Sequence, residues 1–206
     1  MNNQHLSEFL TSENAVLAMI DHQAGLMVAV GDEHPTVLKS NIEGLCKTAK
    51  AINLPAVITA SLPEGPNGPV IPEITNILGG KIIEREGQIN AWDSKAFTDA
   101  IRATGRKKII MAGIVTDVCL LFPALSAVAE GYDVYAVIDA SGTWNKTVQE
   151  VTLHRLTQAG VKVTTWASVL AEIMNDWRSE HGSALGEVLA AHTTKYGYVM
   201  NSHFAK

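Results

Sequence analysis

Segments with strand character and segments with helix character alternate six times along the 206 residues of the chain. Short apolar runs bounded by Gly, Pro or polar residues predict strands, and apolar residues at helical spacing predict helices. The expected strands are Val16–Ile20, Pro55–Ala60, Lys81–Arg85, Lys107–Gly113, Asp133–Asp139 and Val161–Trp166. The expected helices are about Thr36–Ile52, Pro72–Leu78, Ser94–Thr104, Asp117–Glu130, Thr147–Ala159 and Val169–His181. Short connections of this kind require a parallel sheet with helices on both faces, so the pattern predicts an α/β fold.

The central stretch Lys107–Leu125 predicts a buried strand, a tight turn at residues 114–116 and a helix that begins at Asp117, with Thr116 as its N-cap. Cys119 falls in the first turn of that helix. The unpaired N–H groups and the positive dipole end there favour a thiolate over a thiol. Two interpretations of Cys119 are therefore open: a nucleophile, or a small buried apolar residue, which is common for free cysteines.

The order of the strands decides which side chains meet at the ligand crevice of such a sheet. The crevice lies beyond the carboxyl ends of the strands, where the order reverses. If the order is 3-2-1-4-5-6, Asp21 and Cys119 follow adjacent strands, and Arg85 ends a strand at the same edge. This convergence favours Cys119 as a nucleophile. The alternative for Asp21 and Arg85 is a salt bridge that only joins two strand ends.

An acid, a cation and a thiol in one crevice predict acyl transfer. Burial would raise the pKa of Asp21 and make it a base for the thiol, whereas Arg85 stays charged and cannot move a proton. Backbone N–H groups of residues 114–116 and of the helix start could hold an oxyanion. We expect attack on an amide carbonyl, release of an amine and hydrolysis of a thioester.

Several other residues are weaker candidates for the functional site. His22 is a second candidate base, but it points away from Asp21 if the strand geometry continues. Asn90 and Trp92 lie on a loop over the crevice, where they either bind a small substrate or support the turn and fill the core. Cys46 sits at a core position of a helix. The sequence contains no Walker loop, G-x-G-x-x-G or paired Cys/His spacing, so we expect no cofactor and no metal.

Composition narrows the class of protein. The net charge of −5 and the lack of a dense Lys/Arg block give no footprint for nucleic acid or an anionic membrane. No apolar run is long enough to span a bilayer, and the polar start lacks a secretory apolar region. Two cysteines, Cys46 and Cys119, make no disulfide framework. We expect one domain over residues 1–206 and a cytoplasmic setting.

The sequence resembles the isochorismatase-like cysteine hydrolase superfamily, in particular its YcaC-like branch, through nearly the whole chain. The resemblance is carried by VLAMIDHQAGL (Val16–Leu26), GPNGP (Gly65–Pro69), GQINAWD (Gly87–Asp93) and the segment Gly113–Thr143. It implies a three-layer α/β/α sandwich around a six-stranded parallel sheet, and an Asp–Lys–Cys triad that falls on Asp21, Arg85 and Cys119. Arg85 departs from the usual lysine, with Lys81 as a weaker alternative.

The resemblance also implies a non-proline cis peptide, expected at Val115–Thr116, whose N–H would face the oxyanion. Nicotinamidase-like members carry a D-x-H metal site after the second strand, which Thr59–Pro69 lacks. Family members commonly form oligomers, and the tail 185–206 could serve that purpose. We therefore expect a cytoplasmic homo-oligomeric hydrolase of a small amide, carbamoyl or related C–N substrate. The alternatives are a catalytically weak, self-assembling scaffold or binding protein and a flavodoxin-like nucleotide binder.

Overall fold

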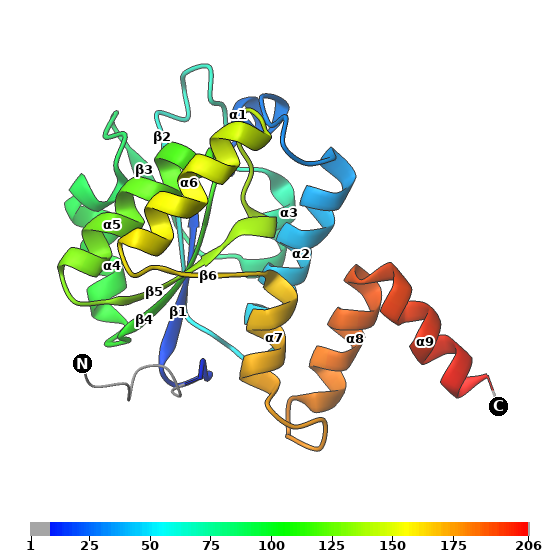
Figure 1. Ribbon diagram of the computed structural model, residues 1–206. Helices are drawn as coiled ribbons and strands as arrows, with labels where there is room; N and C mark the ends of the chain where they lie inside the picture. The colour runs from blue at the N-terminus through cyan, green and yellow to red at the C-terminus, as the bar shows by residue number, and fades with distance from the viewer. Residues whose placement is uncertain (1–8, 206) are drawn as a thin grey trace.

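The computed structural model describes residues 9–205, which form a six-stranded sheet flanked by helices (Figure 1). The strand order is β3-β2-β1-β4-β5-β6, and every neighbouring pair is parallel, as the alternation of elements predicted. The strands are β1 (Ala15–Ile20), β2 (Ala56–Ser61), β3 (Ile82–Arg85), β4 (Lys108–Gly113), β5 (Asp133–Val137) and β6 (Lys162–Thr164).

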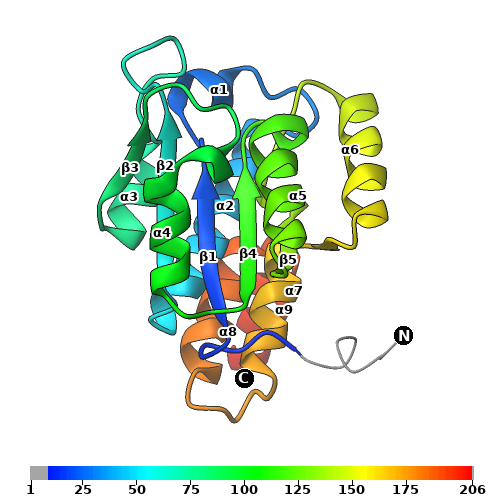
Figure 2. The same cartoon turned by 90° about the vertical axis from the view of Figure 1, so that its left-hand side faces the viewer.

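The helices form two layers, one on each face of the sheet (Figure 2). The first layer contains α2 (Pro35–Ala51), α3 (Pro72–Leu78), α7 (Trp166–Met174) and α8 (Gly182–His192). The second contains α4 (Lys95–Ala103), α5 (Leu121–Ala129) and α6 (Lys146–Gln158). A short helix α1 (Ala24–Val28) follows β1, at the end to which the arrowheads of β1 and β4 point.

Strand β1 shows why the sheet is apolar on both sides. Its residues alternate between two hydrophobic cores: Leu17 and Met19 face the layer of α2, while Val16, Ala18 and Ile20 face the layer of α4 and α5. Side chains alternate along any strand, so a strand covered on both faces must be apolar throughout. Each core is therefore built from the same central strands.

Residues 24–28 form the short helix α1, which is not among the helices expected from the sequence. Two expectations about local structure were wrong. The helix expected to begin at Asp117 is a π-helical turn, Thr116–Leu120, followed by α5. The last expected helix ends at Met174 rather than His181, because Asn175 takes a left-handed conformation (φ 54°) that stops α7.

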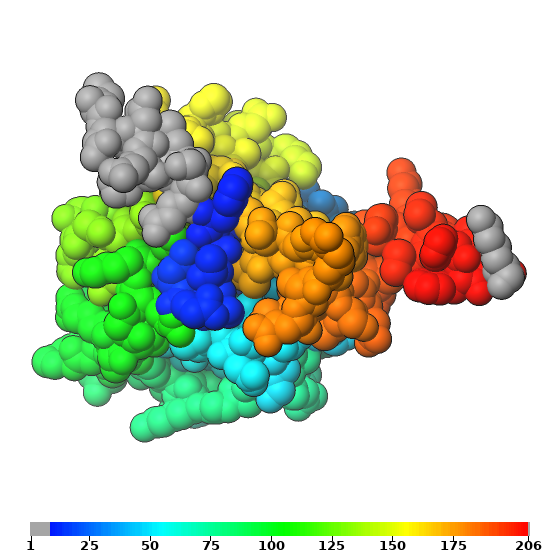
Figure 3. Space-filling view, turned by 90° about the horizontal axis from the view of Figure 1, so that it is seen from below, coloured from blue at the N-terminus to red at the C-terminus, as the bar shows by residue number. Residues whose placement is uncertain are grey.

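The C-terminal region forms two helices, α8 and α9 (Thr194–Phe204), where the sequence showed only weak periodicity. Helix α9 has no buried residue and stands away from the rest of the molecule (Figure 3). The rings of Trp177 and Tyr196 stack at 6.2 Å and link the base of α9 to the segment after α7. Within residues 9–205, none of the helices combines the length and apolar character needed to cross a membrane.

Candidate active site

The carboxyl ends of β1, β2 and β3 place a buried ion pair at one edge of the sheet. Asp21 directly follows β1, with a left-handed backbone (φ 56°) and its N–H bonded to the Thr59 carbonyl at 3.0 Å. Arg85 is the last residue of β3. Its Nη2 donates to Asp21 Oδ2 at 2.6 Å, and both side chains are fully shielded from solvent. Sequence reasoning placed these two residues at one edge, and the structure brings them into contact.

Arg85 is held by three sets of bonds. Besides Asp21, its Nη1 donates to Thr59 Oγ1 at 3.2 Å and its Nε donates to the Gln88 carbonyl at 3.0 Å. Thr59 in turn donates to the Ile83 carbonyl at 2.7 Å. The guanidinium is therefore a fixed positive charge with every nitrogen engaged. Lys81, the alternative cation, precedes β3 at its opposite end and is exposed.

Cys119 lies in the π-helical turn that follows β4, the neighbour of β1. Its side chain is nearly buried (8 % exposed), and its N–H donates to the Val115 carbonyl at 2.8 Å. Gly113 permits this turn, because a Cβ there would lie 3.0 Å from the Leu120 nitrogen. The turn therefore folds back closely over the end of β4.

The environment of Cys119 favours the thiol, so the expectation that its surroundings favour a thiolate was wrong. Burial raises the pKa of the Cys119 thiol, and the neighbouring Asp21 carboxylate raises it further, against weaker opposing effects of a hydrogen bond from the Val115 backbone and of Arg85. These interactions outweigh the helix-start effect invoked from the sequence. The thiol proton consequently remains on sulfur while a carboxylate lies beside it.

Asp21 has the properties of an acceptor for that proton. Burial raises the pKa of the Asp21 carboxyl above its usual value, while Arg85 and the Cys119 thiol oppose the shift. Asp21 Oδ1 has no geometrically defined hydrogen-bond partner within residues 9–205. One carboxylate oxygen is thus fixed by Arg85, and the other is left for exchange with the thiol or a ligand.

The turn before Cys119 contains a cis peptide bond, but at Ile114–Val115 rather than at the expected Val115–Thr116. The Thr116 N–H already donates to the Gly142 carbonyl at 2.9 Å, so it is not a spare oxyanion donor. Among residues 9–205 the Val115 N–H makes no hydrogen bond to another backbone group, and a hydrogen bond from the Val115 backbone lowers the pKa of the Cys119 thiol. Thr116 does not cap the turn through its side chain, and its buried hydroxyl has no partner among the described residues.

Asn90 and Trp92 are engaged in the protein's own structure. Asn90 Oδ1 accepts from the Trp92 N–H at 3.0 Å, and Asn90 Nδ2 donates to Ser126 Oγ at 3.1 Å. The Trp92 ring is buried edge-on against Phe97, and its Nε1 donates to Glu130 at 2.8 Å. These contacts support the turn and fill the core, and a role of Asn90 and Trp92 in substrate binding stays a prediction.

The surroundings of His22 do not suit a proton-transfer role. It is buried, its Nε2 lies 2.9 Å from the Ala140 carbonyl, and burial lowers its pKa to about 4. Its Nδ1 has no partner among the described residues. No group of three or more His, Cys, Asp or Glu side chains in residues 9–205 is arranged to hold a metal ion.

Sequence reasoning missed the residues that brace the loop after β2. The Gln23 amide donates to the Ser61 carbonyl at 3.1 Å and accepts from the Ser61 N–H at 2.9 Å. Gly25 lies close against the same loop, with its N–H on the Asn67 carbonyl. The available signals were that Gln23 and Gly25 come shortly after the strand that ends at Ile20 and lie within the family motif Val16–Leu26.

Comparison with known proteins gives consistent matches. The isochorismatase domain model matches residues 15–168. The Escherichia coli protein named "probable hydrolase YcaC" is 43% identical over 195 residues, covering 94% of this chain and 93% of that protein. Its crystal structure, described as an octameric hydrolase of unknown specificity, has a TM-score of 0.92 at 41% identity and covers 96% of this chain and 97% of that chain.

A second solved structure is YcaC from Pseudomonas aeruginosa with hexane-2,5-diol and covalent acrylamide. It has a TM-score of 0.93 at 41% identity and covers 97% of this chain and 98% of that chain. The domain match and both high-identity relatives span the strands that carry Asp21, Arg85 and Cys119. The chain therefore belongs to the isochorismatase family of hydrolases, and YcaC is a close relative.

Proposed function

We propose that this protein is a cysteine-dependent hydrolase that cleaves a small amide, carbamoyl or related C–N bond through a thioester. The observation that carries the proposal is the buried group formed by Asp21, Arg85 and the Cys119 thiol. Asp21 follows β1 and Cys119 lies in the turn after the neighbouring strand β4, and each of the two groups shifts the pKa of the other, which supports their proximity. A thiol beside a charge-stabilised carboxylate is the arrangement that an activated sulfur nucleophile requires.

In the proposed first step, the Cys119 sulfur forms a bond to the carbonyl carbon while its proton passes to Asp21. The electron pair of the C=O bond moves to oxygen, for which the Val115 N–H is the proposed donor. Collapse of this intermediate breaks the C–N bond, and Asp21 returns the proton to the leaving nitrogen. Arg85 keeps its charge throughout and stabilises the ionised form of Asp21.

In the second step, water attacks the thioester carbon. Asp21 removes a proton from that water, and the acid product leaves as the C–S bond breaks. Cys119 regains its proton, so the cycle consumes one water and no external reductant or oxidant. The raised pKa of Asp21 suits both directions of proton movement, because an acid–base group works best near the operating pH.

Acrylamide provides a direct test, and the covalent acrylamide in the P. aeruginosa relative supports its use. We expect intact-protein mass spectrometry to detect one adduct and peptide mapping to place it on Cys119. The Cys119→Ala variant should lose the adduct. The Cys46→Ala variant should keep it, because Cys46 is fully buried and burial raises its pKa to about 12.

The catalytic claim needs a panel of activated amides and carbamoyl compounds, with acid quenching to trap a thioester on Cys119. Wild-type protein should accumulate acyl-enzyme with at least one compound, and Asp21→Asn should not. Absence of any acyl-enzyme across the panel would contradict the hydrolase proposal. A Cys119 pKa near that of free cysteine would favour the alternative of a catalytically weak scaffold.

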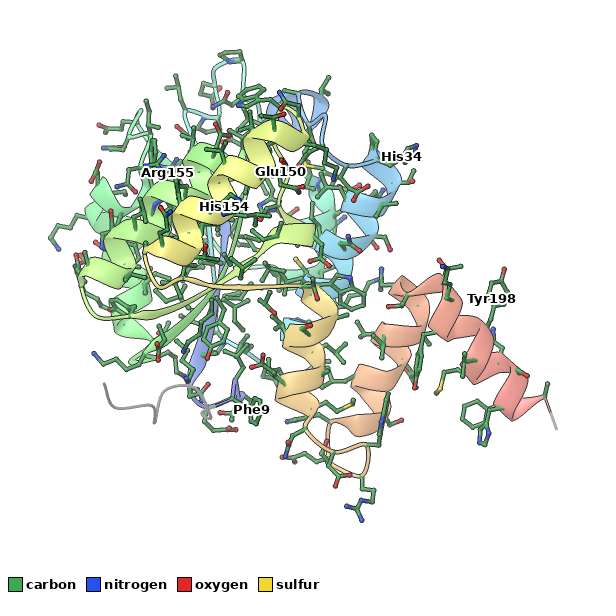
Figure 4. All side chains as sticks on the ribbon, in the orientation of Figure 1. Phe9, His34, Glu150, His154, Arg155 and Tyr198 are labelled. Carbon is green, nitrogen blue, oxygen red and sulfur yellow. The ribbon has the colours of Figure 1, made fainter. Side chains whose placement is uncertain are left out.

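We also propose that the protein assembles with copies of itself through α9. This helix has no buried residue and exposes Tyr198, Val199 and Phe204, with Tyr198 on its outer surface (Figure 4). The octameric state of the E. coli relative supports self-assembly. Light scattering after size-exclusion chromatography should show an oligomer that dissociates when Tyr198 and Val199 are both changed to Lys. An unchanged mass for this variant would place the contact elsewhere.

A further inference from the structure

Thr143 joins two parts of the chain that lie on opposite sides of it. Its N–H donates to Asp32 Oδ1 at 2.7 Å, and its hydroxyl donates to Asp117 Oδ1 at 2.7 Å. Its carbonyl accepts from the Gly31 N–H at 2.8 Å and the Asp32 N–H at 3.2 Å. Thr143 is completely buried, and its bond to Asp32 is shielded from water, whereas its bond to Asp117 is partly buried.

One side of this junction is the turn that carries Cys119. Asp117 is the second residue of the π-helical turn, and Thr116 is the first. The Thr143 hydroxyl holds Asp117, and the neighbouring Gly142 carbonyl accepts from the Thr116 N–H at 2.9 Å. The first two residues of the turn are therefore both fixed to the segment 142–143, outside the turn itself.

The other side is the loop between α1 and α2. Asp32 is buried in this loop at 4 % exposure, and it contacts Thr143 through both its backbone and its side chain. Asp32 Oδ2 has no partner among the described residues. The hydrogen bond from the Thr143 N–H to Asp32 Oδ1 is therefore the main interaction that offsets the cost of burying this carboxylate. The loop thus fixes the Thr143 backbone, and the Thr143 hydroxyl remains available to donate its hydrogen bond to Asp117.

We propose that Thr143 is a positioning residue for the nucleophile, transmitting the position of the Asp32 loop to the Cys119 turn. This inference rests on the proposed function, because it concerns the placement of the same thiol beside Asp21. A five-residue π-helical turn has few bonds of its own, and a displacement of about 1 Å at a reacting atom can cost about 100-fold in rate. External anchors at two successive residues oppose such a displacement.

The test compares two pairs of variants with matched shape. Thr143→Val keeps the branched side chain but removes the donor, whereas Thr143→Ser keeps the donor. Asp117→Leu removes the acceptor, whereas Asp117→Asn keeps an oxygen acceptor and removes only the charge. The readout is the rate constant for acrylamide addition to Cys119, measured by mass spectrometry from pH 6 to about pH 9.5. Thermal unfolding of each variant checks that it is folded.

In wild-type protein we expect the rate to rise across this range without levelling, because Asp21 and burial hold the thiol protonated. Thr143→Val should displace the thiol from Asp21. The rate constant for acrylamide addition should then change by about tenfold or more at one or more pH values, so that the shape of its pH profile also changes. Thr143→Ser should recover most of the wild-type profile. For any substrate found, Thr143→Val should lower kcat more than it raises KM.

Identical rate constants and pH profiles in wild-type and folded Thr143→Val would overturn the proposal. If Thr143→Val does not fold, the Asp117 pair decides: the proposal requires that Asp117→Leu alters the profile and Asp117→Asn largely restores it. Acrylamide addition needs no substrate. Failure to find hydrolysis would therefore count against the proposed function while leaving these measurements as a valid test of Thr143.

Discussion

Replacing Arg85 with Met would remove the cation from a fully buried ion pair while keeping most of the apolar volume. The change deletes the bonds to Asp21, Thr59 and the Gln88 carbonyl, and it leaves the Asp21 carboxylate without its counter-ion. Breaking one side of a buried pair costs about 3–5 kcal/mol, because a charge is left in a medium of low dielectric constant. We expect a loss of this size in the free energy of unfolding near pH 8.

The loss should shrink at lower pH. Burial already raises the pKa of Asp21 although Arg85 opposes the shift, so removing Arg85 should raise the pKa further. A carboxyl whose folded-state pKa lies above its unfolded value loses stability as the pH rises through the folded pKa. The variant should therefore be less destabilised near pH 5 than near pH 8, because a larger fraction of Asp21 is neutral at the lower pH.

Urea unfolding at both pH values measures this difference. The double variant Asp21→Asn with Arg85→Met should recover much of the lost free energy of unfolding, since it leaves no unpaired charge in the interior. Arg102→Met is the matched control: Arg102 pairs with Glu130 at 2.8 Å, but both side chains are more than 40 % exposed, so we expect a much smaller loss than for Arg85→Met. A loss for Arg85→Met that is as small as the control, or that does not change with pH, would refute the reasoning.

Three further outcomes concern residues elsewhere in the fold. His22 has a pKa lowered to about 4 from 6.5 by burial, so stability should fall by up to about 3 kcal/mol as the pH drops from 6.5 to 4; urea unfolding of His22→Gln should show a weaker pH dependence. Gly44→Ala would put a Cβ 2.9 Å from the Trp166 ring, so thermal unfolding should reveal a loss of about 1–3 kcal/mol. Gly25→Ala would press on the loop after β2, and we expect faster proteolysis of that loop without a large change in overall stability.

The fold could be predicted because its signals are local and repeated. The central strands contain short apolar runs, and β1 is apolar at every position because it contributes to both cores. The strand order placed Asp21 and Arg85 at one edge, and their contact in the structure agrees with that reasoning. These inferences need only the period of the strands and the direction of the chain.

Other features depend on contacts between distant residues, which no local pattern displays. The protonation of Cys119 was wrongly predicted because helix position is visible in the sequence, whereas burial and the approach of Asp21 are tertiary effects. The position of the cis peptide was wrong by one bond. The link from Asp32 through Thr143 to Asp117 joins residues more than 80 positions apart and gave no signal at all.

The pairing of Asp21 with Arg85 also bears on how the sheet finds its correct alignment. Arg85 lies opposite Ser61, and the preceding residue in β3 is Glu84. If β3 slipped by one residue against β2, Glu84 would take the inward position and two negative side chains would meet in the interior. We expect this misaligned sheet to be strongly disfavoured, because a one-residue slip exchanges the two faces of a strand and replaces an attraction by a repulsion. The same two side chains that could support chemistry would thus also select the correct arrangement of strands during folding.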